Sequence, residues 1–204
     1  MSFLSESFFQ RDFLTVAREL IGIELLWRGC SGIIVETEGY AIEGDPACHT
    51  ANRESTRQFV RMMPAGACYV YLNYGMYWLL NFNVKGGARD GLILIRAIEP
   101  RKGVREMTRR RAGRPVEELC SGPGKLGIAL GVGGDDHGLI AAGKGRAAGC
   151  GLRKPSAEEA DERFAEVVAD VRVGIRLAAD RPWRFLAKHS SSVSVQCGKV
   201  KPYK

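Results

Sequence analysis

Long apolar runs and closely spaced cysteines are both missing from this sequence of 204 residues. The most apolar stretch, residues 68–84, is interrupted by Asn73, Asn81 and Asn83, whereas a membrane-spanning helix needs roughly 18 consecutive apolar residues. The six cysteines lie 18 residues or more apart, so no Cys-x-x-Cys pair is available for zinc. The first residues lack the basic and apolar segments of an export signal. We therefore expect free thiols in a reducing compartment, no membrane contact and no metal.

Acidic residues are outnumbered by basic ones, and the excess is uneven along the chain. The whole sequence has 30 Lys and Arg against 23 Asp and Glu, a net charge of +7. Residues 101–114 alone carry seven positive charges and one negative charge. Such a stretch is able to contact a phosphate backbone or anionic lipid, or it forms a solvated face of a helix or loop. Charge alone leaves these alternatives open.

The composition and apolar periodicity predict one α+β domain spanning 1–204, built on a curved, largely antiparallel sheet with flanking helices and a protruding hairpin. Hydrophobic residues make up 45% of the chain, enough for a packed core. Helices are expected over 8–20, 100–111, 125–130 and 157–168, and loops over 41–65 and 131–151. Strands are expected over 23–27, 32–40, 67–74, 78–84, 91–98, 171–175, 183–186 and 192–195.

One predicted strand carries two carboxylates and a phenol on the same side. Alternation along residues 34–40 places Glu36, Glu38 and Tyr40 on one face, with Val35 and Thr37 on the other. A polar stripe that faces solvent would give the same pattern. A site for acid–base chemistry is the functional alternative.

Aromatic residues are scarce overall but concentrated in one segment. They form 8% of the chain, yet residues 69–78 contain five of them around Tyr74 and Gly75. Some of these rings must belong to the core. A strand-turn-strand that exposes the others beside a basic region is typical of surfaces on which nucleic-acid bases stack.

Five motifs, in this order along the chain, together resemble the alkyladenine (3-methyladenine) DNA glycosylase family. They are VETEGY at 35–40, HT at 49–50, YVYLNYGMYW at 69–78 followed by Asn81, LIRAIEP at 94–100 and LCSGPGKL at 119–126. The resemblance extends from the first predicted helix to Arg176. The chain departs from the family pattern at Gln58, where asparagine is usual, and over 131–151. The resemblance implies an enzyme that excises damaged purines from duplex DNA.

The resemblance also implies which residues act on the glycosidic bond. Glu38 aligns with the general base that activates a water to attack C1′, and a carboxylate suits the positive charge that develops on the sugar. Arg96 aligns with a residue that orders this water and the adjacent phosphate. It also resembles any strand arginine that pairs with an acid. No lysine lies in the pocket motifs, so we expect a monofunctional hydrolase without lyase activity or cofactor.

Further side chains align with the family's contacts to the extruded base. Tyr74 matches the intercalating residue, Tyr40 and Tyr71 match the rings that sandwich the base, and Asn81 matches the residue that refuses the amine of guanine. His49 matches a hydrogen-bonding group at the purine edge or the 5′ phosphate, and is the one candidate for a general acid on neutral lesions. Electron-rich rings attract cationic bases. We therefore expect a preference for alkylated over neutral purines.

The remaining expectations concern DNA contacts and competing functions. Arg109, Arg110 and Arg111 are candidates for the DNA backbone, Lys125 holds either a loop or a phosphate, and Tyr69 and Tyr77 have packing roles. A monomer in the cytoplasm, at the nucleoid if the source is bacterial, is expected to act on duplex DNA containing damaged purines. The alternatives are a noncatalytic single-strand nucleic-acid binding module, which has no need of Glu38, and a carbohydrate hydrolase.

Overall fold

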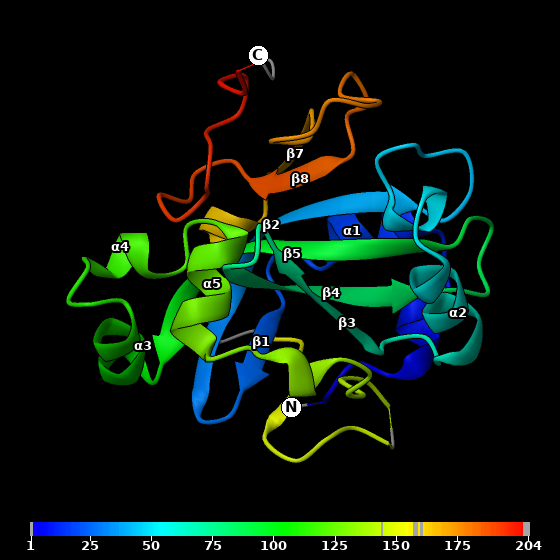
Figure 1. Ribbon diagram of the computed structural model, residues 1–204. Helices are drawn as coiled ribbons and strands as arrows, with labels where there is room; N and C mark the ends of the chain where they lie inside the picture. Colours follow the sequence, from blue (N-terminus) through cyan, green and yellow to red (C-terminus); the bar gives the residue numbers. More distant parts are fainter. Residues whose placement is uncertain (1, 144, 157–158, 160, 202–204) are drawn as a thin grey trace.

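An antiparallel sheet of eight strands forms the frame of the protein in the computed structural model, which describes residues 2–143, 145–156, 159 and 161–201. The strand order is β3-β4-β5-β2-β1-β6, and β8 joins this sheet by pairing with both β2 and β7 (Figure 1). The strands are β1 (Glu24–Trp27), β2 (Cys30–Ala41), β3 (Cys68–Asn73), β4 (Tyr77–Val84), β5 (Gly91–Lys102), β6 (Cys150–Arg153), β7 (Val167–Asp170) and β8 (Arg184–Ala187). The predicted α+β fold is confirmed.

Strand β2 lies in the middle of the sheet and has neighbours along both edges. One edge pairs with β5, while the other pairs first with β1 and then, over residues 36–38, with β8. Glu36, Thr37 and Glu38 are therefore enclosed between β5 and β8, and all three are fully buried. Because buried polar groups need hydrogen-bond partners, the sheet must satisfy both carboxylates internally.

Helices cover both faces of the sheet, with α1 behind it and α5 in front of it in Figure 1. The helices are α1 (Phe13–Glu19), α2 (Glu54–Met62), α3 (Val104–Arg110), α4 (Val116–Leu119) and α5 (Pro123–Leu130), with 3-10 turns at Glu6–Phe9, His49–Ala51, Gly134–Asp136 and Glu162–Phe164. Helix α5 approaches β4 closely at Gly127, where a Cβ atom would collide with the carbonyl oxygen of Trp78. No helix in the described part of the chain is both long enough and apolar enough to cross a membrane.

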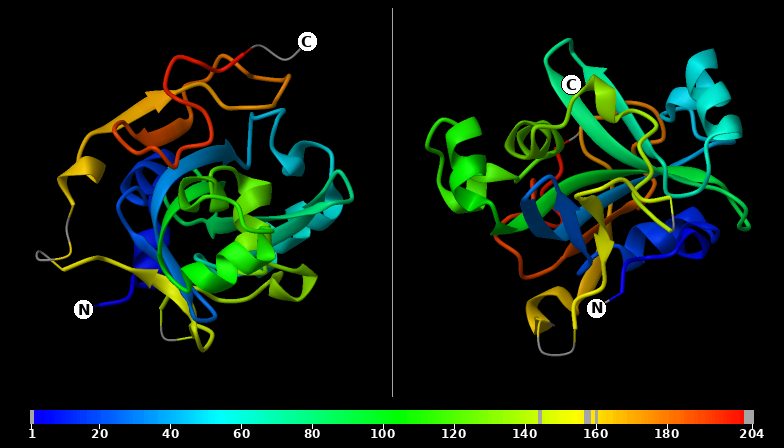
Figure 2. Two further views of the ribbon diagram at one scale, coloured as in Figure 1. Left: turned by 90° about the vertical axis from the view of Figure 1, so that its left-hand side faces the viewer. Right: turned by 90° about the horizontal axis from the view of Figure 1, so that it is seen from below.

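The β3–β4 hairpin projects from the body, with α2 on one side and α3 and α5 on the other (Figure 2, right). Its turn is closed by a hydrogen bond from the amide of Met76 to the carbonyl of Asn73, 3.0 Å. Between them, Tyr74 and Gly75 both have left-handed backbone angles, with φ of 51° and 66°. Two such residues in succession match the twist of a tight hairpin. The predicted protruding hairpin is confirmed.

The glycine-rich segment 131–151 covers the outer edge of β3. The amide of Cys68 donates to the carbonyl of Leu139, and the amide of Gly138 donates to the carbonyl of Cys68, both at 2.8 Å. Nδ1 of His137 lies 2.8 Å from the carbonyl oxygen of Val70. An exposed strand edge is prone to pair with other chains, so this cover protects the hairpin from aggregation. Strand β6 begins inside the predicted loop, at Cys150.

Two of the predicted helices start later than expected. Within 8–20, α1 begins only at Phe13, because the Asp12 side chain accepts hydrogen bonds from two amides of the first turn, at 3.0 and 3.4 Å, and caps it. The helix expected from Pro100 is wrong at its start, since β5 continues to Lys102. Pro100 is tolerated because the β2–β5 register is irregular there. The loop expected over 41–65 contains α2.

Three elements predicted in the last third of the chain are wrong. Residues 171–175 and 192–195 are not strands, because the amides of Val173 and Ser194 donate to buried carboxylates of β2 instead of a neighbouring strand. The helix expected over 157–168 is replaced by a 3-10 turn and the start of β7. Residues 157, 158 and 160 lie outside the described residues.

Candidate active site

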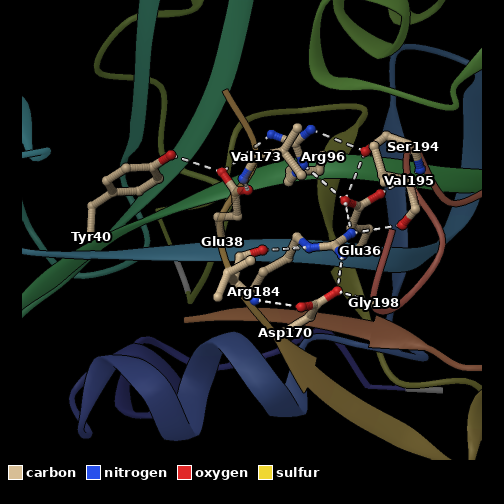
Figure 3. A network of polar contacts seen from close by, with 11 residues as sticks. Glu36, Glu38, Tyr40, Arg96, Asp170, Val173, Arg184, Ser194, Val195 and Gly198 are labelled. Atoms are coloured by element: carbon tan, nitrogen blue, oxygen red, sulfur yellow. Dashed lines mark hydrogen bonds and ion pairs between the residues drawn. The ribbon is translucent and has the colours of Figure 1, made fainter. Parts of the chain in front are cut away.

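Two glutamates of β2 and one arginine of β5 form a buried charged cluster (Figure 3). Arg96 donates from Nε to Oε1 of Glu36, 2.9 Å, and from Nη1 to Oε2 of Glu38, 3.2 Å. Between the glutamates, Thr37 points the other way and donates to the carbonyl of Ala17 in α1, 2.8 Å. The predicted alternation along β2 is therefore confirmed, but the shared face is interior rather than solvent-exposed.

Irregular pairing of β2 with β5 places Arg96 between the two carboxylates. The register shifts on both sides of Glu36, so that Val35 in β2 and Arg96 in β5 each lack a directly opposite residue in this ladder. Bulges of this kind redirect side chains and are common beside active sites. A single guanidinium is thereby able to reach two acids on the neighbouring strand.

The two glutamates differ in how many hydrogen bonds they already accept. A carboxylate has about four acceptor positions. Glu36 accepts from Arg96, from Arg184 at 2.9 Å, and from both the amide and the hydroxyl of Ser194, at 2.6 and 2.8 Å. Within the described residues, Glu38 accepts three bonds, and its Oε1 accepts only from the Val173 amide, 2.6 Å. Glu38 thus retains room for one more donor, such as a water.

Opposite charges in the cluster shift the pKa values of Glu36 and Arg96 toward their ionised forms. Burial alone would raise the pKa of Glu36, but Arg96, the Ser194 amide and Arg184 outweigh it, and the pKa is lowered. Burial would likewise lower the pKa of Arg96, but Glu38 and Glu36 raise it above its ordinary value. Burial, and then the charge of Glu38, raise the pKa of Tyr40 well above its usual range. Tyr40 is therefore a neutral phenol that donates to Glu38, 2.8 Å.

A cavity of about 340 Å³ opens beside the cluster, in the size range of small-molecule sites. The structure brings six of the predicted site residues to its wall: Tyr40, His49, Tyr71, Tyr74, Asn81 and Arg96. Glu38 lies one layer behind this wall, because its three hydrogen-bond partners, Tyr40, Arg96 and Val173, all line the cavity. These three groups therefore link the Glu38 carboxylate to the cavity by hydrogen bonds.

His49 belongs to a group of rings on one wall of the cavity. Its ring meets that of Tyr71 edge-on, with centroids 4.3 Å apart, and its Nδ1 lies 3.0 Å from the hydroxyl of Tyr69. Burial and the nearby charge of Arg53 lower the pKa of His49 from 6.5 to about 4. His49 is consequently neutral at pH 7. It is a hydrogen-bonding group there and a poor general acid.

The lowered pKa of His49 predicts a specific loss of stability in mild acid. Below about pH 6.5 the unfolded chain binds a proton at His49 that the folded protein refuses until about pH 4, so unfolding becomes easier as the pH falls through this window. Urea unfolding at a series of pH values should show that His49→Ala removes part of this slope. An imidazole resonance of His49 that titrates near 6.5 would contradict the expectation.

Hydrogen bonds fix both Asn81 and Tyr69 at the cavity wall. Nδ2 of Asn81 donates to the carbonyl of Tyr69, 3.1 Å, which fixes the orientation of the amide at the cavity wall. The hydroxyl of Tyr69 lies 2.8 Å from Oγ1 of Thr56, and its ring is buried among apolar residues. The predicted packing role of Tyr69 agrees with this burial, although the residue also lines the cavity.

The tip of the hairpin carries exposed apolar side chains. Tyr74 is 72% exposed and Met76 is 65% exposed. Tyr74 also lines the mouth of the cavity. Tyr77 is less exposed and lies against α5 at Gly124, as its predicted packing role requires. The hairpin tip therefore presents apolar surface at the mouth of the cavity.

The predicted basic residues divide into outward- and inward-directed groups. Arg109 is exposed and pairs with Glu106 on α3, 2.7 Å. Arg110 and Arg111 are only partly exposed and donate to carbonyls at α5 and α4, at 3.0 and 3.2 Å. Lys125 donates to a serine hydroxyl four residues before it, 3.1 Å. Of the three arginines, Arg109 is the most exposed, and its guanidinium donates to both carboxylate oxygens of Glu106.

Sequence reasoning missed two buried arginines beside the cluster. Arg184 links Glu36 to Asp170, 2.6 Å, and is fully buried. Arg172 forms two hydrogen bonds with Asp45, at 2.6 and 3.0 Å. Both arginines come from the last third of the chain and pair with acids far away in sequence. An arginine inside an apolar strand pattern, as in Trp183–Leu186, is the one signal that could have indicated such a pair.

Comparison with known proteins shows which family the chain belongs to. The methylpurine-DNA glycosylase family matches residues 7–191. A protein of Agrobacterium fabrum is 42% identical over 93% of this chain and 91% of its own length, and one of Bradyrhizobium diazoefficiens is 38% identical over 94% and 90%. Both bear the name "Putative 3-methyladenine DNA glycosylase". The chain therefore belongs to the methylpurine-DNA glycosylase family.

Proposed function

We propose that this protein is a monofunctional DNA N-glycosylase that releases alkylated or deaminated purines from duplex DNA. The observation that carries the proposal is the place of Glu38, whose three hydrogen-bond partners all line the cavity, whereas of the partners of Glu36 Arg96 alone is among the lining residues described. Glu36 already accepts four hydrogen bonds, whereas Glu38 accepts three and lies directly behind a cavity wall. Glu38 is therefore the acid that is able to hold and deprotonate a water.

The reaction begins when the damaged nucleotide leaves the helix and enters the cavity. Extrusion costs about a few kcal/mol of stacking and pairing, and least for a damaged base. The exposed Tyr74 fills the gap left in the duplex, while Tyr40 and Tyr71 enclose the extruded base. The fixed amide of Asn81 discriminates among purine edges at the wall.

Glu38 then acts on a water that approaches its Oε1 beside Val173. The water oxygen bonds to C1′ of the sugar, its proton passes to the Glu38 carboxylate, and the base departs with the electrons of the N-glycosidic bond. Arg96 donates a hydrogen bond to Oε2 of this carboxylate and so orients it. No lysine is among the described residues that line the cavity, so a Schiff base with the sugar has no nucleophile among them.

Release of free base from a defined duplex tests this proposal. Single-turnover reactions on duplexes with one 7-methylguanine or hypoxanthine should yield free base and an abasic strand that remains intact until alkali is added. Strand cleavage without alkali would refute the monofunctional mechanism. Tight single-strand binding with no base release would instead identify the noncatalytic binding module.

Replacing Tyr74 with glycine is expected to separate stability from base extrusion. Tyr74 has a left-handed backbone conformation, which costs a non-glycine residue on the order of 1 kcal/mol, so the variant should be as stable as the wild type or more stable. Loss of the ring should nevertheless lower excision by roughly 10-fold or more, since nothing offsets the unstacking. Thermal unfolding and single-turnover rates measure the two effects. A wild-type rate of excision by Tyr74→Gly would show that Tyr74 is not the intercalating residue.

Arg109 is expected to contact the DNA backbone, while Arg110 supports the fold. Neutralising residues 109–111 together should flatten the dependence of log affinity on log salt by up to about one unit for each phosphate that is no longer neutralised. Arg109→Gln alone should account for about one unit on damaged and undamaged duplex alike. Arg110→Gln, the matched control, should lower thermal stability with little change in slope. An unchanged slope in Arg109→Gln would show that residues 101–114 form a solvated face and do not contact the DNA backbone.

A further inference from the structure

Each of the two tyrosines that enclose the base in the proposed function has an arginine over its ring. Cζ of Arg172 lies 4.7 Å from the centroid of the Tyr40 ring, and Cζ of Arg53 lies 5.9 Å from that of Tyr71. Both tyrosines line the cavity, whereas neither arginine is among its lining residues. The two positive charges therefore stand outside the cavity wall, close to the rings that would touch the base.

The two arginines differ in how their charge is balanced. Arg172 is fully buried, and its guanidinium is matched by the carboxylate of Asp45. Arg53 is exposed at the start of α2 and, within the described residues, forms no ion pair with a carboxylate. Of the two, Arg53 is the cation that no ion-paired carboxylate among the described residues neutralises, because the adjacent Glu54 pairs with Arg57 and Arg61.

Arg53 lies beside one wall of the cavity, over the ring of Tyr71. Burial raises the pKa of the neighbouring Tyr69, and the charge of Arg53 opposes this rise. Its charge also acts on His49, where it adds to burial in opposing protonation. His49, Tyr69 and Tyr71 all line the cavity, so Arg53 lies close to three of its wall residues at once.

A fixed positive charge at this place opposes the attraction of the rings for a cationic base. An aromatic face attracts a cation through its quadrupole, but a ring that already holds a guanidinium has less attraction left for a second cation. Like charges also repel directly, and more strongly in a partly desolvated cavity than in water. Tyrosines alone predict a strong preference for cationic lesions, and Arg53 weakens it.

We propose that Arg53 is a specificity-determining residue that reduces the preference of the cavity for cationic, N-alkylated bases and so allows neutral purine bases to compete. This inference rests on the proposed function of the cavity. It differs from a phosphate contact, because removing a phosphate contact weakens the binding of cationic and neutral lesions by the same factor.

The test compares two lesions that have the same shape and differ by one charge. Duplexes carry either 7-methylguanine, which is cationic, or its neutral isostere 7-methyl-7-deazaguanine, each on a 2′-fluoro sugar that resists hydrolysis. Dissociation constants for both are measured with the wild type and Arg53→Gln. The matched control is Arg61→Gln, which removes one exposed charge from the last turn of the same helix. The Arg61 guanidinium reaches back to Glu54, which keeps its ion pair with Arg57 in this variant.

Arg53→Gln is expected to shift the ratio of the two dissociation constants toward the cationic lesion by about three- to ten-fold. Arg61→Gln should leave the ratio unchanged, even if both affinities fall. An unshifted ratio in Arg53→Gln, or an equal shift in both variants, overturns the inference. Failure of the proposed function is distinguishable, because the wild type would then neither prefer the lesion duplexes over undamaged DNA nor release base from a hydrolysable 7-methylguanine.

Discussion

Replacement of Glu38 by glutamine is expected to lower single-turnover base excision by about 10²-fold or more, with little change in lesion binding. Glutamine has nearly the same size but does not take a proton from water. Tyr40 and Arg96 both donate to Oε2, and the glutamine oxygen is able to keep these two bonds. The amide nitrogen would then face Val173, so only that hydrogen bond is lost.

Binding and chemistry are measured separately for this variant. Affinity is determined on a duplex whose damaged nucleotide carries a 2′-fluoro sugar, and excision on the natural nucleotide with enzyme in excess. Thermal unfolding confirms that the variant is folded at the assay temperature. Excision at a near wild-type rate by folded Glu38→Gln would show that Glu38 is not the base. A parallel loss of binding would indicate damage to the cavity wall instead.

Local patterns were sufficient to predict the strands and the hairpin that build the cavity. Period-two alternation over 34–40 correctly places Glu36 and Glu38 on one face, because each side chain of a strand alternates regardless of its surroundings. Tyr74 and Gly75 are correctly placed at a turn, since the hairpin is formed by residues adjacent in sequence. The burial of that face was not predictable, because it depends on pairing of β2 with β8 from the end of the chain.

The parts that sequence could not predict depend on distant partners. Residues 171–175 and 192–195 have the apolar alternation of strands, yet the amides of Val173 and Ser194 donate to glutamates more than 130 residues away. The roles of Arg172 and Arg184 likewise follow from long-range contacts with acids. Local periodicity does not reveal such a long-range contact, so the alternation of these two segments is misleading.

Replacement of Glu36 by glutamine is expected to damage the fold more than the chemistry, with a loss of about 3 to 5 kcal/mol in the free energy of unfolding. Glu36 accepts from two buried arginines, Arg96 and Arg184, and from Ser194. A neutral amide leaves part of this positive charge without a counter-charge and turns an N–H group toward a donor. Such a loss is a large share of the roughly 5 to 15 kcal/mol that stabilises a typical domain.

Glu106→Gln is the matched control, because Glu106 also bonds two arginines, Arg109 and Arg110, but at the surface. Urea unfolding should show little change there, since solvent screens exposed pairs. The pKa of Glu36 is lowered in the folded protein, so its contribution is present above about pH 4.5 and is lost as the pH falls through the folded value. The difference between wild type and Glu36→Gln should therefore shrink in acid. Equal losses in the two variants, or a difference independent of pH, would mean that burial of the charge is not what stabilises the cluster.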